Sequence, residues 1–401
     1  MNNKKMLFSI FLVVFIDLLG FSLILPLLPF YAETFGASPV IIGFLVAAYA
    51  AAQFIGAPIL GRLSDRYGRK PLLLASIFGS ILGFLLLGVA NSLWAIFLAR
   101  IIDGITGGNI SVAQAYISDI TDEKNRARGL GLIGAAFGLG FIIGPALGGL
   151  LSQWGYSTPA FVAAGLSTIN FLSIIFWLPE SLTSQRRAEI QKANRPPFTL
   201  NALWQALRRP LVGPLLHSRF FFGMAFATFQ TIFTLYAQYR FGLGSQQTGY
   251  ILAYVGLLSV ITQGFVIGRL AKRFSENNLL FAGCAMLAVS FLGWAFAPSI
   301  PLLLVIIIPI SLSGGILNTV INSAITKAVA PVEIGGMLGL SASLESLTRV
   351  IAPSLAGVLL QVVGPAAPGV FSSILMLALT SYVWRNIIHS RLATLSTDPV
   401  S

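Results

Sequence analysis

The chain has 401 residues, of which 56% are apolar and only 9% are charged, and its mean hydropathy is +0.85. Soluble domains carry about 25% charged residues, so this composition excludes a water-soluble protein and predicts an integral membrane protein. The net charge of +12 does not indicate a nucleic-acid partner, because we assign every Lys and Arg except Arg100, Arg240 and Arg349 to the termini and alternate loops. This bias follows the positive-inside rule and predicts that both termini are cytoplasmic.

Apolar runs of about 20 residues, which can cross a bilayer as helices, recur twelve times along the chain. The first run follows the basic segment Met1 to Lys5. It is too long for a signal peptide, so we interpret it as a retained span. The expected spans are residues 6–29, 40–60, 72–90, 93–116, 128–151, 158–178, 214–238, 247–268, 279–297, 300–323, 334–360 and 366–389.

The longest predicted loop is basic and separates six spans from six. We therefore predict an all-α membrane protein of twelve transmembrane helices in two six-helix halves. The predicted parts are an N-terminal bundle over 1–179, a cytoplasmic linker over 180–213 and a C-terminal bundle over 214–401. Apolar residues at helical spacing within the linker predict an amphipathic helix on the inner leaflet; they are Leu200, Leu203, Trp204, Leu207 and Leu211.

The two predicted halves carry traces of an internal repeat. The loop GRLSDRYGRKP, which begins at Gly61, aligns with GRLAKRFSENN, which begins at Gly268. The same shift pairs the glycines at 107–108 with those at 314–315. Repetition of this kind is typical of transporters built from two structural repeats.

Charged residues lie inside two of the predicted spans of the first half. Asp17 lies midway along the first span, and Arg100 and Asp103 lie in the fourth. Each such charge costs roughly 2.5–3.5 kcal/mol at the bilayer centre, so these residues indicate function. Arg100 and Asp103 are close enough in sequence to touch on one helix face, and we expect Arg100 to be the counter-charge of Asp17. We predict that the three residues couple proton uptake and release to transport, the alternative being a static ion pair.

Other polar residues in the predicted spans are candidates for a substrate cavity between the halves near the bilayer midplane. These candidates are Gln53, Gln114, Phe226, Gln230, Thr234, Asn318 and Asn322. Glu345 and Arg349 lie four residues apart in span eleven, in the favourable order for a helical pair. We predict that this intrahelical pair neutralises itself; a role in substrate or proton handling is the alternative.

Three motifs in the first half together resemble the major facilitator superfamily. The first is the loop GRLSDRYGRKP, and the second places Arg100, Gly104 and Gly108 along the fourth span. The third is the antiporter motif of span five, which consists of Gly131, Gly140, Gly144, Pro145, Gly148 and Gly149. The segments DLLGFSLILPLLPFY, ARIIDGITGG, AYISDITDEKNRARG and LPES further resemble the twelve-span drug/proton antiporters of the tetracycline-efflux type.

This resemblance implies roles for the motif residues. A cytoplasmic gate is implied at Gly61, Asp65, Arg66, Gly68 and Arg69. Asp65 is implied to dock against the start of span eleven and to close the cytoplasmic side, whereas a solvated loop that only fixes topology is the alternative. The antiporter motif of span five is associated in this superfamily with export rather than uptake.

We therefore predict a secondary-active efflux transporter that exchanges protons for a small amphipathic, drug-like or tetracycline-like compound. The alternative is an exporter or facilitator of an endogenous metabolite, sugar or lipid-like molecule. We expect no enzymatic activity, no metal and no cofactor, with the proton gradient as the energy source. The expected partners are the substrate, protons and the lipid bilayer, without nucleic acid. We expect a monomer in a bacterial inner membrane.

Overall fold

The computed structural model describes residues 3–183, 187, 200–330 and 333–389, and the predicted all-α membrane architecture is confirmed. Twelve helical segments of this described part are long and apolar enough to cross a membrane. They are Lys5–Ile24, Pro39–Tyr67, Arg69–Gly88, Leu93–Ile120, Gly129–Trp154, Ser157–Trp177, Gly213–Phe241, Ser245–Arg273, Glu276–Ala295, Ile300–Lys327, Ile334–Val362 and Ala367–His389.

The chain divides into two compact units, described separately below. Unit 1 comprises 1–196 with 242–257, and unit 2 comprises 197–241 with 258–401. The first part of span eight therefore groups with unit 1, because its glycines lie against the fifth span: Gly249 faces Pro145, and Gly256 faces Phe141. The division by chain order into 1–179, 180–213 and 214–401 stays a prediction.

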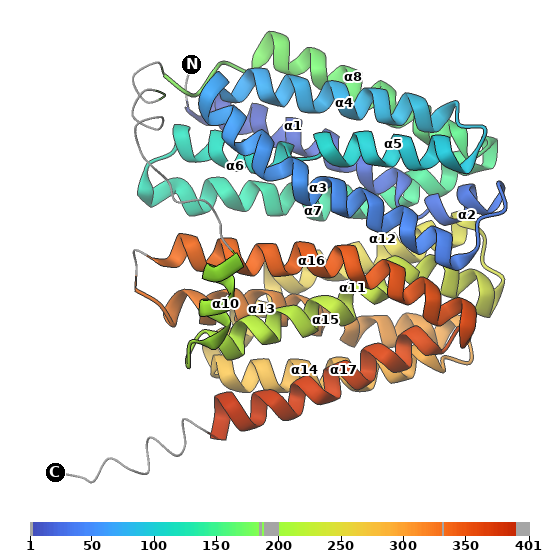
Figure 1. The fold of residues 1–401 in the computed structure, drawn as a ribbon, viewed down its shortest axis with the longest axis vertical. Helices are drawn as coiled ribbons and strands as arrows, with labels where there is room; N and C mark the ends of the chain where they lie inside the picture. The colour runs from blue at the N-terminus through green and yellow to red at the C-terminus, as the bar shows by residue number, and fades with distance from the viewer. Residues whose placement is uncertain (1–2, 184–186, 188–199, 331–332, 390–401) are drawn as a thin grey trace. The chain divides into compact units, whose positions relative to one another are not determined.

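Unit 1 is a bundle in which α1 packs along α7, α3 along α5, and α4 along both α5 and α8 (Figure 1). Its apolar core includes Ile10, Ile77, Tyr116 and Ile174, all of which are fully buried. The elements are α1 Asn3–Ile24, α2 Leu28–Glu33, α3 Pro39–Tyr67, α4 Arg69–Gly88, α5 Leu93–Thr106, α6 Asn109–Ile120, α7 Glu123–Leu151, η1 Ser152–Trp154, α8 Ser157–Trp177 and the first part of α12 Ser245–Ile261.

Span four is broken into α5 and α6, which the continuous apolar run over 93–116 did not predict. The break falls at Gly107 and Gly108, and glycine is a poor helix former. A side chain at Gly108 would meet Ala57 Cα at 2.8 Å, so the glycine permits α3 to approach closely. The break matters because Asp103 lies before it and Asn109 directly after it.

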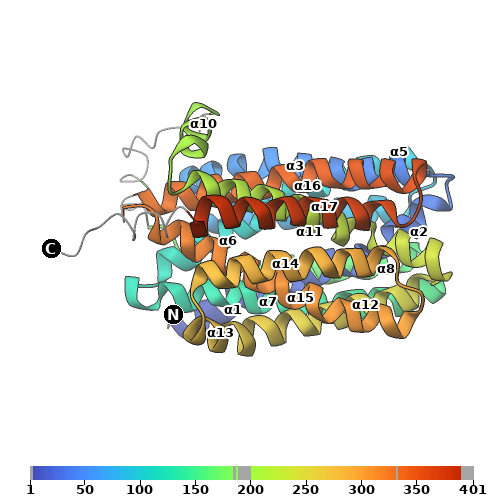
Figure 2. The ribbon, with the colours of Figure 1, turned by 90° about the horizontal axis from the view of Figure 1, so that it is seen from below.

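In unit 2, α11 packs against α16 and α17, and α14 packs between α15 and α17 (Figure 2). The Trp294 ring lies 5.0 Å from those of Phe229 and Tyr236, and the Tyr236 hydroxyl donates to the Trp294 carbonyl at 2.5 Å. The elements are α10 Leu200–Arg208, α11 Gly213–Phe241, the π-helix η2 Thr262–Val266, α13 Ile267–Arg273, α14 Glu276–Ala295, α15 Ile300–Lys327, α16 Ile334–Val362, α17 Ala367–Val383 and the π-helix η4 Trp384–His389.

The predicted amphipathic helix of the linker is present as α10, although Leu211 lies beyond its end. Residues 184–186 and 188–199 of the linker lie outside the described part of the chain. Arg209 donates to both carboxylate oxygens of Glu333 at 3.0 and 3.1 Å, and these hydrogen bonds lower the pKa of the Glu333 carboxyl. This exposed pair links the end of α10 to the start of α16.

Two glycines of the antiporter motif set the spacing between α7 and α1. A Cβ at Gly144 would overlap the Ser22 hydroxyl, and one at Gly148 would overlap the Leu23 carbonyl oxygen. The Ser22 hydroxyl also donates to the Gly140 carbonyl at 2.8 Å. Gly131, in contrast, has no atom within 4 Å of the position that a Cβ would take. The motif therefore combines close-packed glycines with at least one that faces open space.

We expect Gly148→Ala to lower the free energy of unfolding by about 1–3 kcal/mol, because overpacking must move the α1 backbone. Gly131→Ala is the matched control and should be neutral or slightly stabilising, because alanine is the better helix former. Thermal unfolding of the two detergent-purified variants provides the comparison. Equal melting temperatures would show that the α1–α7 contact does not depend on the glycine.

Candidate functional site

Asp17 lies on α1 inside unit 1 and has an amide as its hydrogen-bonding partner. The side chain of Asn109, at the first turn of α6, hydrogen-bonds to the Asp17 carboxylate, and Asp103 acts on it electrostatically. Asn109 is 6% exposed. The break between α5 and α6 brings the amide and the second carboxylate to the same part of α1.

Arg100 and Asp103 form the predicted ion pair on one face of α5. The two residues are buried, and Arg100 Nη2 lies 2.6 Å from Asp103 Oδ2. The guanidinium also lies 4.4 Å from the centroid of the Tyr49 ring on α3, a cation–π geometry. Ser80 on α4 hydrogen-bonds to the Asp103 carboxylate. This site therefore joins α3, α4 and α5.

The expected ion pair between Asp17 and Arg100 is absent among the described residues, and that prediction was wrong for this structure. Asp103 takes the guanidinium because it lies one helical turn away on the same helix. The site thus has two carboxylates and one cation, which leaves one negative charge in excess. A proton is the simplest group that neutralises such a site.

Sequence reasoning missed three contributors to this site. Asn109 carried a signal, because it is an amide in an apolar span directly after two glycines. Tyr49 and Ser80 carried none, because their contacts with Arg100 and Asp103 cross between spans that are distant in sequence. The candidate Gln53 lies beside the same site: its amide donates to the Gly107 carbonyl at 2.9 Å and to the Tyr49 hydroxyl at 3.2 Å.

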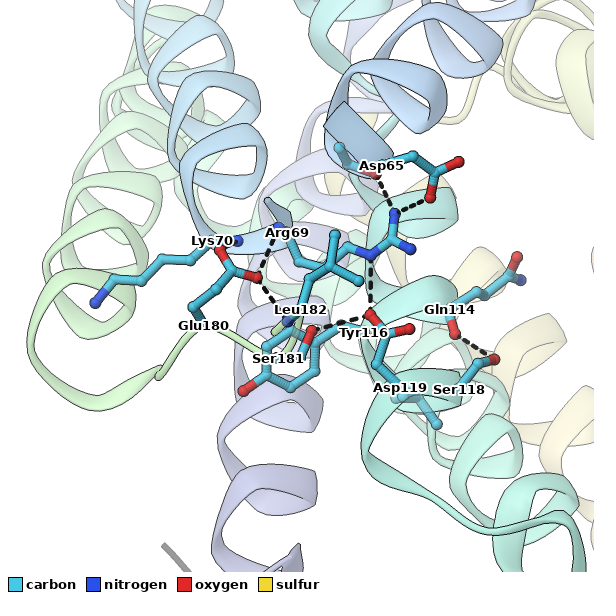
Figure 3. Close-up of polar contacts among 12 residues, drawn as sticks. Asp65, Arg69, Lys70, Gln114, Tyr116, Ser118, Asp119, Glu180, Ser181 and Leu182 are labelled. Carbon is cyan, nitrogen blue, oxygen red and sulfur yellow. Dashed lines mark hydrogen bonds and ion pairs between the residues drawn. The ribbon is translucent and has the colours of Figure 1, made fainter. Parts of the chain in front are cut away.

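A second charged cluster lies where α3 ends and α4 begins (Figure 3). Arg69 is 4% exposed and pairs with Asp65 at 2.7 Å and with Asp119 of α6 at 3.0 Å. It also donates to the Ser64 hydroxyl at 2.6 Å. The guanidinium therefore ties three helix ends together within unit 1.

Glu180 supplies the N-terminal cap of α4. Its carboxylate accepts hydrogen bonds from the backbone amides of Arg69 at 2.9 Å and Lys70 at 3.1 Å (Figure 3). A carboxylate is favourable at a helix N-terminus, where backbone N–H groups lack partners. Gly68 has φ +109°, and a side chain there would overlap Glu180. The glycine is thus required both by its conformation and by this close approach.

The structure brings together some of the predicted gate residues. Asp65, Gly68 and Arg69 belong to the cluster, whereas Arg66 is exposed and lies over the Tyr67 ring at 5.4 Å. A Cβ added at Gly61 would lie 3.9 Å from the Ser111 hydroxyl. The docking of Asp65 on span eleven stays a prediction. Asp119 and Glu180 were missed as members, although both lie in motif segments, AYISDITDEKNRARG and LPES.

The predicted pair of Glu345 and Arg349 forms in unit 2, with a distance of 2.9 Å, but Glu345 has a second partner. Arg219 of α11 also pairs with it and donates to Asn318 at 2.6 Å. The assignment of Arg219 to a loop is wrong, because it is 5% exposed within the span Gly213–Phe241. Its position inside the predicted span 214–238 is the signal that pointed to a buried charge.

The remaining substrate candidates differ in accessibility. Thr234 is buried and is 3% exposed, which places it in the packing of unit 2. Gln114, Gln230 and Asn318 are exposed, Phe226 is half-buried, and Asn322 lines a cavity that also contains Arg219 and Glu345. Gln114 and Gln230 have no described contact with either buried charge site.

Comparison with known proteins gives a consistent family. The model of the Major Facilitator Superfamily matches residues 10–352 and 264–395. The tetracycline resistance protein, class B, of Escherichia coli is 33% identical over 358 residues, which is 86% of each chain. Solute carrier family 22 member 18 of Rattus norvegicus is 29% identical over 374 residues, covering 91% of this chain and 90% of that protein.

Among solved structures, that of the human organic anion transporter MFSD10 (TETRAN) covers 96% of this chain and 100% of its own. The TM-score is 0.71 and the sequence identity is 23%. At this identity the likeness supports the fold alone.

We expect Arg69→Leu to lower the free energy of unfolding by about 1–3 kcal/mol, because Asp65, Asp119 and Ser64 lose a shared charged donor. Arg62→Leu removes the same side chain from an exposed position near the end of α3, and its effect should lie within about 0.5 kcal/mol of zero. Melting temperatures in detergent test the difference. If both substitutions had the same effect, the buried cluster would not stabilise unit 1.

Proposed function

We propose that this chain, which belongs to the Major Facilitator Superfamily and is therefore a membrane transporter and not an enzyme, is a proton-coupled exporter. Its cargo would be a small amphipathic compound of the tetracycline class. The single observation that carries the proposal is the site formed by the half-buried Asp17 and the buried residues Asn109, Asp103 and Arg100. This site has one carboxylate more than it has cations.

A proton on Asp17 would change how α1 meets α5 and α6. In the ionised state the carboxylate accepts the Asn109 hydrogen bond and is repelled by Asp103. Protonation removes that repulsion and turns the carboxyl into a donor as well. A ligand, here the proton, shifts a conformational equilibrium only when its contacts differ between the two conformations. Antiport then follows if substrate and proton favour opposite conformations.

Two lines support export of a drug-like compound. The antiporter motif of span five is present, and relatives named as tetracycline resistance proteins match over most of the chain. The solute carrier relative favours the alternative, an exporter or facilitator of an endogenous metabolite, sugar or lipid-like molecule. Drug susceptibility of cells that express the chain separates these alternatives.

The proposal includes an orientation and a gate. The positive-inside bias of the Lys and Arg residues supports cytoplasmic termini, and the bacterial relatives support an inner-membrane location. In the gate, Asp65 would leave part of its interaction with Arg69 to dock at the start of span eleven. A monomer suffices for this mechanism.

We expect Asp17→Asn to abolish uphill transport but to leave folding intact. The amide cannot release a proton, so exchange would no longer be tied to the gradient. The measurement is tetracycline accumulation in reconstituted vesicles with an imposed pH gradient, alongside tetracycline exchange without a gradient. Asp17→Asn should retain the exchange and accumulate no more than vesicles without a gradient.

Glu33→Gln, which makes the same chemical change on the short helix α2, is the control and should accumulate tetracycline normally. Accumulation by Asp17→Asn at the wild-type level would assign the coupling to another residue. If the wild type transported no tetracycline in both the accumulation and the exchange assay, the alternative substrate class would be favoured.

The orientation has its own test, with two exposed asparagines as a matched pair. Asn91 lies between α4 and α5, and Asn125 lies in the first turn of α7. In a Cys284→Ala background, Asn91→Cys should react with an impermeant maleimide from outside intact cells. Asn125→Cys should react only after the cells are opened. Labelling of both from the same side would contradict the topology.

A further inference from the structure

A cavity of about 380 Å³ lies in unit 2, where α15 ends and α11 and α16 begin. Its polar wall is formed by Arg219, Asn322, Ser323, Thr326, Ser341 and Glu345. Its apolar wall includes Leu338 and Ala342. Ligand sites of transporters and enzymes have this composition, with apolar surface and a few convergent polar groups, and this volume is at the small end of their range.

The charges at this cavity do not balance. Glu345 is the carboxylate, and it pairs with two guanidinium groups, those of Arg219 and Arg349. The three residues therefore carry one positive charge in excess. This is the opposite of the unit 1 site, which has two carboxylates, Asp17 and Asp103, and one cation, Arg100. An anion is the ligand that would neutralise the excess.

Two buried donors at the cavity wall have no hydrogen-bond partner among the described residues. They are Nε of Arg219 and the hydroxyl of Ser341, and these residues are 5% and 2% exposed. Buried polar atoms without partners are rare and destabilising. Because both residues line the same cavity, an acceptor group placed there would satisfy both atoms at once.

The guanidinium geometry specifies the acceptor further. Nη1 of Arg219 is engaged by Asn318 and Nη2 by Glu345, which leaves Nε. Nε and Nη2 form one edge of the planar group, and that edge matches the two oxygens of a carboxylate. A bound carboxylate would therefore take Nη2 from Glu345, and Glu345 would keep Arg349 as its counter-charge.

We infer that this cavity is a subsite for the carboxylate or enolate group of the transported compound, bound by Arg219 and Ser341 in exchange for Glu345. The inference rests on the proposed function in one respect, that the bound compound is the cargo. It adds the chemical class of the cargo, an organic anion with an apolar body that contacts Leu338 and Ala342.

The test is equilibrium binding of radiolabelled salicylate to the purified full-length chain in nanodiscs, with uncharged salicylamide as the matched probe. The wild type should bind salicylate more tightly than salicylamide. Ser341→Ala should weaken salicylate binding about tenfold, the effect of one hydrogen bond to a charged group. Arg219→Gln should abolish the preference, and Arg219→Lys should not restore it, because lysine lacks the two-donor edge.

Two controls separate binding from folding. Arg269→Gln removes an exposed arginine of α13 and should bind salicylate as the wild type does. Ser341→Ala should unfold at the wild-type temperature or above, because it deletes a hydroxyl without a partner. A lower unfolding temperature together with unchanged binding would mean that the hydroxyl is structural and would overturn the proposal.

Equal binding of the two probes by the wild type would also overturn it, as would wild-type binding by Arg219→Gln. Binding of radiolabelled phosphate that excess salicylate does not displace would identify an inorganic anion site instead and would overturn the proposal. The measurement uses no proton gradient and no transport step, so the wild type should prefer salicylate whether or not it accumulates tetracycline. Failure of the anion subsite is therefore distinguishable from failure of proton coupling.

Discussion

A charge that lies inside a bilayer has to be neutralised by the protein itself, and the polar architecture of both units follows from this constraint. Arg100 is held by Asp103 in unit 1, and Arg219 is held by Glu345 in unit 2. In each unit the ionic contacts extend to neighbouring helices, through Tyr49 and Ser80 in one and Asn318 in the other. The same groups that make the charges tolerable thus also determine which helices respond when a charge changes.

The two units share a repeated sequence pattern but differ in the sign of their uncompensated charge. The positions equivalent to Arg100 and Asp103 are Ile307 and Ile310, which are fully buried in the apolar packing of unit 2. The excess charge is negative in unit 1 and positive in unit 2. This asymmetry suits a division of labour in which one repeat handles the proton and the other recognises an anionic cargo.

Rigid local geometry supports both sites. Gly144 and Gly148 bring α7 against α1, the helix that carries Asp17. Glu180 and Arg69 fix the junction of α3 and α4 through backbone caps and ion pairs. Such close contacts transmit a shift of one helix to the next, since packed interfaces do not deform continuously. Under the proposed function, a shift of α1 on protonation of Asp17 would therefore pass to α7.

The sequence by itself determined the class of protein, the twelve spans and the pair of Arg100 with Asp103. These follow from local rules: about 20 apolar residues make a span, and residues three apart on a helix touch. Only the tertiary structure decided that Asp17 meets Asn109 rather than Arg100, that Glu180 caps α4, and that Glu345 is shared with Arg219. Those contacts join helices distant in the chain, and their partners depend on helix rotation and on the break after Thr106, which hydrophobic periodicity does not encode.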